Sequence, residues 1–238
     1  MNELSKNKLE LLRQRIPIGL RHGLTLLEKN GGDLDQAEKQ FQEEMVVLTI
    51  NKTGVPETVA TKHLIKNRFD VGLTIKSIDE ERYTLTELIL RKCKDKKEDA
   101  LGNIMYSVEE KNNLKREFWL IFDQLKILPF GTYCFMTIME WLNYEGYESF
   151  DYAMNFHLDV VTEQIEKQLL LPQIATTLRQ AKWVYEGQYE AQQKLFKKTG
   201  GLEQTPEMQE LNDQYDIQRP LLIDTLYEYT KKHIDQFP

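Results

Sequence analysis

Residues 11–44 read LLRQRIPIGLRHGLTLLEKNGGDLDQAEKQFQEE, and they decide the fold of the N-terminal part of the chain. Three leucines are spaced by four and three residues, which places them on one helical face: Leu20, Leu24 and Leu27. Asn30-Gly31-Gly32 then favours a helix end, because these residues tolerate positive φ. Asp33 is a typical N-cap for a following helix. The stretch predicts short amphipathic helices joined by a tight turn.

A further helix is expected ahead of these two. Leu9, Leu11 and Leu12 predict one or two helical turns that end at Ile16, because a residue that precedes proline is disfavoured in the α region. The last helix of the group buries apolar side chains along one face, namely Leu34, Ala37 and Phe41. The three helices form a unit of about 40 residues, near the lower limit for a domain that folds unaided.

The same pattern recurs 37 residues later without a gap, which favours a tandem repeat. Identical residues recur at Leu11/Leu48, Leu27/Leu64, Lys29/Lys66, Asn30/Asn67, Asp33/Asp70, Lys39/Lys76 and Glu43-Glu44/Glu80-Glu81. Apolar positions move with them, from Leu34 to Val71 and from Phe41 to Ile78. Because residues 45–48 must close one copy and open the next, we expect a continuous helix there.

The first copy resembles the N-terminal domain of elongation factor Ts, a member of the ubiquitin-associated (UBA-like) three-helix fold. The residues that carry the resemblance are Leu12-Arg13, Ile16-Pro17-Ile18-Gly19, Leu27-Glu28, Gly32-Asp33-Leu34 and Ala37. The chain departs from the family at Ile16 and Pro17, where threonine and glycine are usual, whereas Lys52-Thr53-Gly54 of the second copy is closer to the pattern. The resemblance implies tandem UBA-like units over residues 9–82 and a partner-contacting loop between the first two helices.

This loop is the candidate partner-binding site. It comprises Ile16, Pro17, Ile18 and Gly19 in the first copy and Thr53, Gly54 and Val55 in the second. An exposed apolar loop on so small a domain commonly marks an interaction surface. In the alternative interpretation, Ile16 or Ile18 packs in the core of the small domain or docks it against the C-terminal bundle.

Composition indicates two domains, 1–100 and 101–238. The 238 residues are 41% hydrophobic and 29% charged, which is typical of a soluble globular protein. Residues 1–100 carry 18 Lys and Arg against 17 Asp and Glu, whereas residues 101–238 carry 13 against 21. Three Phe, Trp and Tyr residues precede residue 100 and twenty-one follow it.

The second domain is predicted to be an all-α, aromatic-rich bundle of about five helices without strand pairing. Ser107 and Glu110 have the spacing of a capping box ahead of a helix over 114–125 that ends near Pro129. Residues 132–144 are apolar on most sides and predict a central helix. Further helices are expected over 147–169, over 172–199 with an end at Gly200-Gly201, and from Thr205-Pro206 onward. The long C-terminal helices could also support an oligomer.

Targeting and membrane signals are not expected. Residues 1–8 are polar, Cys93 and Cys134 lie far apart, and the longest apolar run covers only residues 127–139. A bilayer-spanning helix needs about 20 apolar residues. We therefore expect a cytoplasmic protein without a membrane segment.

Catalytic, metal-binding and cofactor-binding motifs are also not found. The four histidines, His22, His63, His157 and His233, are scattered, and His157 is interpreted as a core or boundary residue because it lacks converging ligands. The basic run that begins at Arg91 and ends at Lys97 is the only hint of nucleic-acid binding. We interpret it as a solvated helix end and a hinge, since the acidic second domain would repel phosphates.

The sequence thus predicts a non-enzymatic, adaptor-like protein that binds a protein partner through the UBA-like units, the C-terminal bundle or both. One alternative is a translation-associated factor related in its N-terminal part to elongation factor Ts, although the nucleotide-exchange core of that factor is not found. The other is an enzyme or small-molecule binder with a pocket in the helical bundle. Fold alone does not choose among them.

Overall fold

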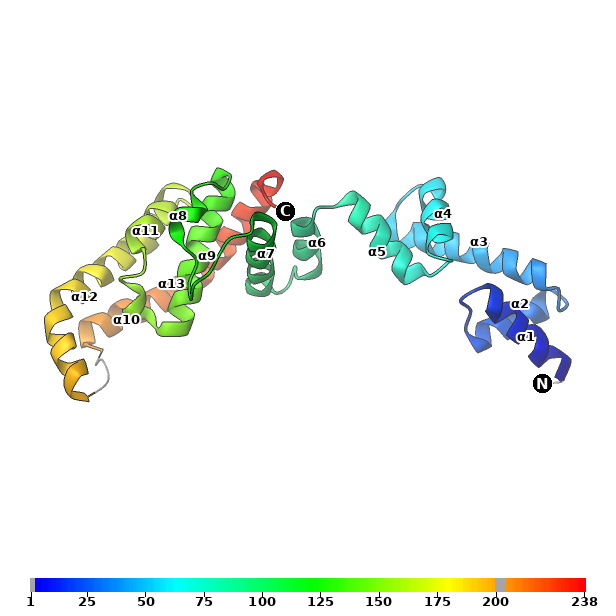
Figure 1. The fold of residues 1–238 in the computed structure, drawn as a ribbon, viewed down its shortest axis with the longest axis horizontal. Helices are drawn as coiled ribbons and strands as arrows, with labels where there is room; N and C mark the ends of the chain where they lie inside the picture. Colours follow the sequence, from blue (N-terminus) through cyan, green and yellow to red (C-terminus); the bar gives the residue numbers. More distant parts are fainter. Residues whose placement is uncertain (1–2, 200–203) are drawn as a thin grey trace. The chain divides into compact units, whose positions relative to one another are not determined.

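The computed structural model describes residues 3–199 and 204–238, and every named element there is a helix (Figure 1). The all-α class predicted from the sequence is confirmed. Within the described residues, strand-like pairing is limited to an isolated antiparallel bridge between Arg116 and Leu120. The chain divides into two compact units, Met1–Tyr83 and Thr84–Pro238, which we call the N-terminal unit and the C-terminal unit.

The division lies after Tyr83, whereas composition placed it after residue 100. Residue 100 lies inside helix α7 (Lys97–Asn112), and Leu90 of helix α6 (Leu85–Lys92) belongs to the same apolar core as α7. The hydroxyl of Tyr227 donates a hydrogen bond to the Leu90 carbonyl at 3.4 Å. The charged run over 91–99 therefore connects two helices of the C-terminal unit and is not an interdomain hinge.

The N-terminal unit has two apolar cores that share one helix. Its helices are α1 (Glu3–Arg15), α2 (Leu20–Lys29), α3 (Leu34–Thr53), α4 (Glu57–Lys66) and α5 (Val71–Arg82). Helices α1, α2 and α3 enclose the first core, which comprises Leu9, Leu12, Ile16, Ile18, Leu26, Leu27, Ala37 and Phe41. Helices α3, α4 and α5 pack on the second, around Val55, Ala60 and Ile78. Helix α3 is unbroken through residues 45–48, as predicted.

The helix ends around Asn30 are reproduced 37 residues later. Asn30 ends α2 with φ −100° and ψ 20°, and Asn67 ends α4 with φ −99° and ψ 18°. Each asparagine side chain donates to the carbonyl four residues earlier, at 2.8 Å and 2.9 Å. Asp33 and Asp70 then cap α3 and α5 by accepting from backbone N–H groups, as predicted. Both pairs of helices are therefore joined by turns of the same geometry.

These turns differ in the residues that adopt positive φ. Gly31 has φ 61°, and Arg68 occupies the corresponding position with φ 52°. The left-handed region costs a residue with a Cβ about 1–2 kcal/mol, and glycine adds about 0.4–1 kcal/mol of unfolded-state entropy. Because Arg68 is exposed, we expect Arg68→Gly to raise the free energy of unfolding by about 0.5–1 kcal/mol in urea titrations.

The reciprocal change is the control for this prediction. A Cβ added at Gly31 meets no atom within 4 Å, so Gly31→Ala tests the backbone alone. It should lower the free energy of unfolding by a similar amount. A stabilising effect of Gly31→Ala would contradict the assigned conformation.

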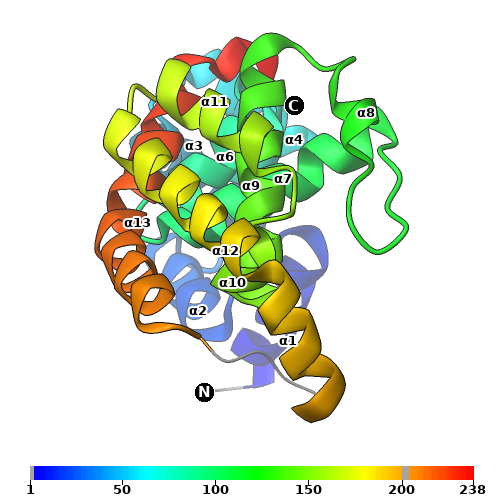
Figure 2. The same ribbon diagram turned by 90° about the vertical axis from the view of Figure 1, so that its left-hand side faces the viewer.

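The C-terminal unit is built around helix α9 (Phe130–Glu148), which is buried along most of its length. Its other helices are α6, α7, α8 (Phe122–Leu125), α10 (Phe150–Ala153), α11 (Leu158–Lys167), α12 (Pro172–Thr199), α13 (Pro206–Lys232) and the short 3₁₀ helix η1 (Ile234–Gln236). Helix α9 contacts α7, α8, α10, α11 and α13, and α12 packs along α11 and α13. The central helix predicted over 132–144 is confirmed. Figure 2 shows α8 and its loop at one side of this unit.

Three predicted segments differ from the structure. Ser107 lies inside α7, where its hydroxyl donates to the Ile104 carbonyl at 2.7 Å instead of capping a new helix. Residues 113–121 form a loop, and Pro129 precedes α9 instead of ending a helix. The helix expected over 147–169 is broken, because Ser149 and His157 have φ values of 121° and 53°.

The last two helices agree better with the prediction. Helix α12 begins at Pro172 and extends to Thr199, as expected. The predicted end at Gly200-Gly201 lies outside the described residues. Thr205 caps α13 by accepting from the Met208 N–H at 3.4 Å, and Pro220 lies within that helix.

Candidate functional site

Residues 113–121 are held in place by one arginine that binds two carboxylates. The Nε and Nη2 atoms of Arg116 donate to Glu109 at 2.8 Å and 2.6 Å. Its Nη1 and Nη2 atoms donate to Glu140 at 3.0 Å and 2.9 Å. Glu140 is completely buried and also accepts from the Leu120 N–H at 2.7 Å. The loop is therefore fixed to α7 through Glu109 and to α9 through Glu140.

The loop and its neighbours bring seven rings together. We call this set the aromatic surface: Phe118, Trp119, Phe122, Tyr144, Tyr147, Phe156 and His157. The rings come from the loop, from α8, from the end of α9 and from the segment before α11. Every ring lies within 6.2 Å of another, measured between centroids. The contacts make one continuous cluster.

One edge of the aromatic surface is open to solvent. Phe118 and Tyr147 are 69% and 70% exposed, and Trp119 between them is half-buried. The centroid distances among these three rings are 5.7 Å, 6.2 Å and 5.8 Å, with interplanar angles of 63–70°. Rings that pack in this edge-to-face way support one another while they leave apolar area exposed. The surface is therefore ordered before any partner binds.

His157 belongs to this cluster as an aromatic ring. Its ring stacks on Phe122 with centroids 3.9 Å apart and an interplanar angle of 12°. Burial lowers the pKa of His157, so the ring is neutral at neutral pH. In the described part of the chain, no three His, Cys, Asp or Glu residues are grouped so that they could hold a metal ion. The imidazole therefore acts here as one of the aromatic rings of the cluster.

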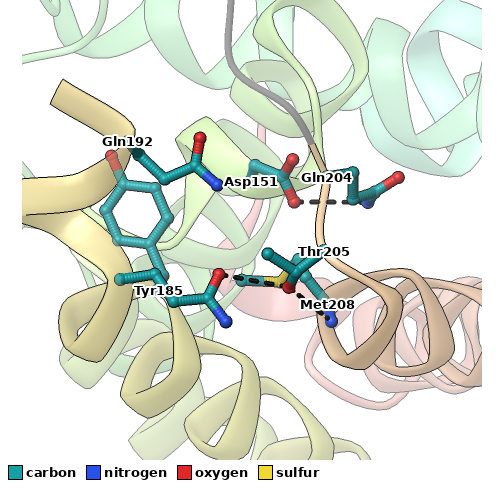
Figure 3. A pocket seen from close by; sticks show the side chains of 7 residues that line it. Asp151, Tyr185, Gln192, Gln204, Thr205 and Met208 are labelled. Atoms are coloured by element: carbon teal, nitrogen blue, oxygen red, sulfur yellow. Dashed lines mark hydrogen bonds between the residues drawn. The ribbon is translucent and has the colours of Figure 1, made fainter. Parts of the chain in front are cut away.

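A small polar hollow, with about 10 Å³ of space for the centre of a water-sized sphere, lies between α10, α12 and the start of α13 (Figure 3). It is lined by Asp151, Tyr185, Gln188, Gln192, Gln204, Thr205 and Met208. Gln204 Nε2 donates to Asp151 Oδ1 at 3.3 Å, and Thr205 Oγ1 donates to Gln188 Oε1 at 3.1 Å. Burial raises the pKa of Asp151. Because these groups bind one another across the hollow, it joins three helices and leaves room for about one water molecule.

The sequence-predicted site residues do not form an exposed apolar patch. Ile16 and Ile18 are buried in the first core of the N-terminal unit, and Val55 is buried in the second. The Thr53 hydroxyl donates to the carbonyl of Thr49 at 2.7 Å. Residues left at the surface are Pro17, Gly19 and Gly54. The apolar side chains of both loops thus belong to the cores, and partner binding at these loops stays a prediction for the exposed positions.

Serine substitutions at Ile18 and Val55 test whether these side chains are buried in the cores. Ile18→Ser and Val55→Ser each remove apolar contacts and place a hydroxyl in a core, so each should lower the free energy of unfolding by about 1–3 kcal/mol. Leu20→Ser, at a 59% exposed position next to the same loop, is the matched control and should change it by less than about 0.5 kcal/mol. Urea titration monitored by circular dichroism measures both. A negligible loss at Ile18 would contradict its place in the core.

The N-terminal unit has its own exposed apolar face along α3 and α4. Val47 and Ile65 are exposed beside Phe69, and they line a solvent-open groove of about 770 Å³. Its rim carries Lys39 and Glu57, so charges of both signs border it. The groove lies away from Ile16 and Ile18, and sequence reasoning did not single it out.

The sequence did not predict the aromatic surface either, because Phe118 and Phe122 fall within the helix that was expected over 114–125. A signal was present in the charges around it. Residues 127–166 contain seven Asp and Glu but no Lys or Arg, in the same stretch that supplies four of the seven rings. Acidic residues among the rings indicate that part of this stretch faces solvent, although the same stretch contains the buried helix α9. In the described residues, no helix is long and apolar enough to cross a membrane.

Comparison with known proteins gives a family match over the C-terminal unit. Residues 84–235 match a family model described as the YfbN C-terminal domain, and the match begins where that unit begins. The chain is also 37% identical, over 165 residues, to a protein of Escherichia coli strain K12 described as uncharacterized protein YfbN. The aligned region covers 69% of each chain. No solved structure matches.

Proposed function

This chain belongs to the YfbN C-terminal domain family, and we propose that the family domain is a protein-binding module. We further propose that the whole chain is a non-enzymatic, adaptor-like protein. The C-terminal unit contacts its partner through the aromatic surface. The observation that carries this proposal is the exposure of Phe118 and Tyr147 at the edge of a seven-ring cluster.

The physical basis is the cost of leaving such rings in water. Each buried Å² of apolar surface contributes about 25 cal/mol, and Phe, Tyr and Trp bury about 150–250 Å² each. Aromatic residues are therefore enriched among the residues that dominate binding energy at interfaces. Arg116 holds the loop through four hydrogen bonds to two helices, so little ordering entropy is lost when a partner binds.

The N-terminal unit supplies the second half of the proposal. It is a tandem of two UBA-like units that share α3, and it offers a second contact region to the same or another partner. The recurrence of the Asn30 and Asp33 geometry at Asn67 and Asp70 supports this assignment. The apolar groove along α3 and α4 is the part of this unit best suited to such contact, because its side chains are exposed.

The test is partner recovery by affinity purification from native cells with two matched double variants. Phe118→Ala with Tyr147→Ala removes the exposed rings, and we expect recovery of the specific partner to fall at least about tenfold, as is typical for loss of two aromatic anchors. Tyr106→Ala with Trp183→Ala removes rings that are 67% and 73% exposed elsewhere on the same unit. That control should recover the partner fully.

Thermal unfolding separates binding from folding in this experiment. Both double variants replace exposed side chains, so their melting temperatures should stay within a few degrees of the parent chain. Equal partner recovery with the two double variants would overturn the aromatic surface as the binding site. A deletion of residues 1–83 then shows whether the partner contacts the N-terminal unit instead.

A further inference from the structure

The aromatic surface lies in a strongly acidic part of the chain. Residues 109–166 include all seven rings, and they contain 11 Asp and Glu against 4 Lys and Arg. The two cations nearest to the rings in sequence are engaged differently. Arg116 is used within the fold by Glu109 and Glu140, whereas Lys115 has no ion pair in the described residues. Acidic residues therefore outnumber basic residues by seven in this part of the chain.

Most of the surrounding carboxylates are neutralised inside the protein, but those beside the exposed rings are not. Asp123 pairs with Lys126, and Asp159 pairs with Lys182. Glu117 follows Arg116 and precedes Phe118, and Glu148 follows Tyr147; neither makes an ion pair in the described part of the chain. Burial raises the pKa of Tyr144, another ring of the aromatic surface, and the negative charge of Glu148 raises it further. A carboxylate without an ion pair thus adjoins each exposed ring in the sequence, and that of Glu148 acts on Tyr144 within the same cluster.

From this charge arrangement we infer that the partner presents lysine or arginine side chains to the aromatic surface, an inference that rests on the proposed function. A cation over an aromatic face is attracted by the ring quadrupole, and arginine can stack on a ring while it donates hydrogen bonds to a carboxylate. Glu117 and Glu148, the residues next to Phe118 and Tyr147 in the sequence, can supply that carboxylate. Nucleic acid is disfavoured, because its phosphates would meet uncompensated acidic groups.

Selection from a random peptide library displayed on phage tests the inference with the full chain as bait. Peptides that bind the parent chain are counter-selected against the Phe118→Ala/Tyr147→Ala variant. We expect the ring-dependent peptides to be enriched in arginine or lysine. Ring-dependent peptides without cationic residues would overturn the inference and leave the proposed function standing. A selection without any ring-dependent peptide would overturn both.

A selected peptide then measures the contribution of charge. Replacement of its arginine by citrulline, a neutral residue of nearly the same shape, should weaken binding about threefold to thirtyfold, the range of cation–π contacts. Glu148→Gln should weaken it severalfold and reduce its salt dependence, because one attractive charge is removed. Glu10→Gln makes the same charge change at an exposed position of α1 in the N-terminal unit and should have no effect, whereas Lys115→Ala should leave binding unchanged or strengthen it. Equal affinity for the arginine and citrulline peptides would overturn the inference.

Discussion

Replacement of Arg116 by methionine is expected to lower the free energy of unfolding of the C-terminal unit by about 3–5 kcal/mol, the usual cost of removing one partner from a buried ion pair. Glu140 is completely buried, so the change leaves its carboxylate without a counter-ion in a low-dielectric site. The two hydrogen bonds to Glu109 are lost as well. Urea titration monitored by circular dichroism measures the difference.

A second substitution shows whether the buried charge is the cause. Glu140→Gln keeps an acceptor for the Leu120 N–H but carries no charge, so it should restore part of the stability lost in Arg116→Met. The double variant is therefore expected to be more stable than Arg116→Met alone. Equal stability of the two would show that lost packing, and not the unpaired carboxylate, accounts for the effect. A loss below about 1 kcal/mol in Arg116→Met would contradict the anchoring role.

Trp141→Ala is expected to have an effect of similar size, about 3–5 kcal/mol, since this is the usual cost of truncating a buried large aromatic side chain. Trp141 is completely buried on α9, and its indole N–H donates to the Ala153 carbonyl at 3.0 Å. Its ring also packs edge-to-face on Tyr215 with centroids 5.7 Å apart. The substitution therefore opens a cavity between α9, α10 and α13.

The exposed tryptophan of α12 provides the control for this prediction. Trp183 is 73% exposed, so Trp183→Ala should change the free energy of unfolding by less than about 0.5 kcal/mol. Trp141→Phe keeps most of the ring volume but loses the hydrogen bond, and its effect should fall between the two. Similar losses for Trp141→Ala and Trp183→Ala would show that α9 is not the centre of the core.

Arg116→Met and Phe118→Ala together separate an effect on stability from an effect on binding. Arg116→Met should reduce partner binding as well, because it releases the loop that carries Phe118. Phe118→Ala should reduce binding while the fold is kept. Comparison of these variants shows whether the aromatic surface must be held rigid in order to bind.

The sequence predicted the elements whose signals are local. The caps at Asp33, Asp70 and Thr205 are confirmed, because a capping side chain reaches only two or three residues along the chain. The start of α12 at Pro172 is confirmed for a similar reason, since proline is well tolerated in the first helical turn. Helix α9 was recognisable because a helix that is apolar on nearly all sides can only be central.

The predictions that differ from the structure concern contacts between distant residues. The spacing of Phe118, Phe122 and Leu125 fits a helix, yet Arg116 binds Glu140, which is 24 residues away, and this pairing holds the segment as a loop. The change in aromatic content near residue 100 suggested a boundary there. Helix α6 packs with α7 in the C-terminal core, so the boundary lies earlier, after Tyr83.

The sequence by itself thus determined the helical class, the turns at Asn30 and Asn67, and the shared helix between the two N-terminal cores, because each depends on side chains a few residues apart. Only the tertiary structure decided which apolar residues are exposed. Ile18 and Val55, in loops, proved to be buried, whereas Phe118 and Tyr147 proved to be at the surface. The apolar area of all four side chains favours their burial, and the packing of the surrounding helices decides where room for burial exists.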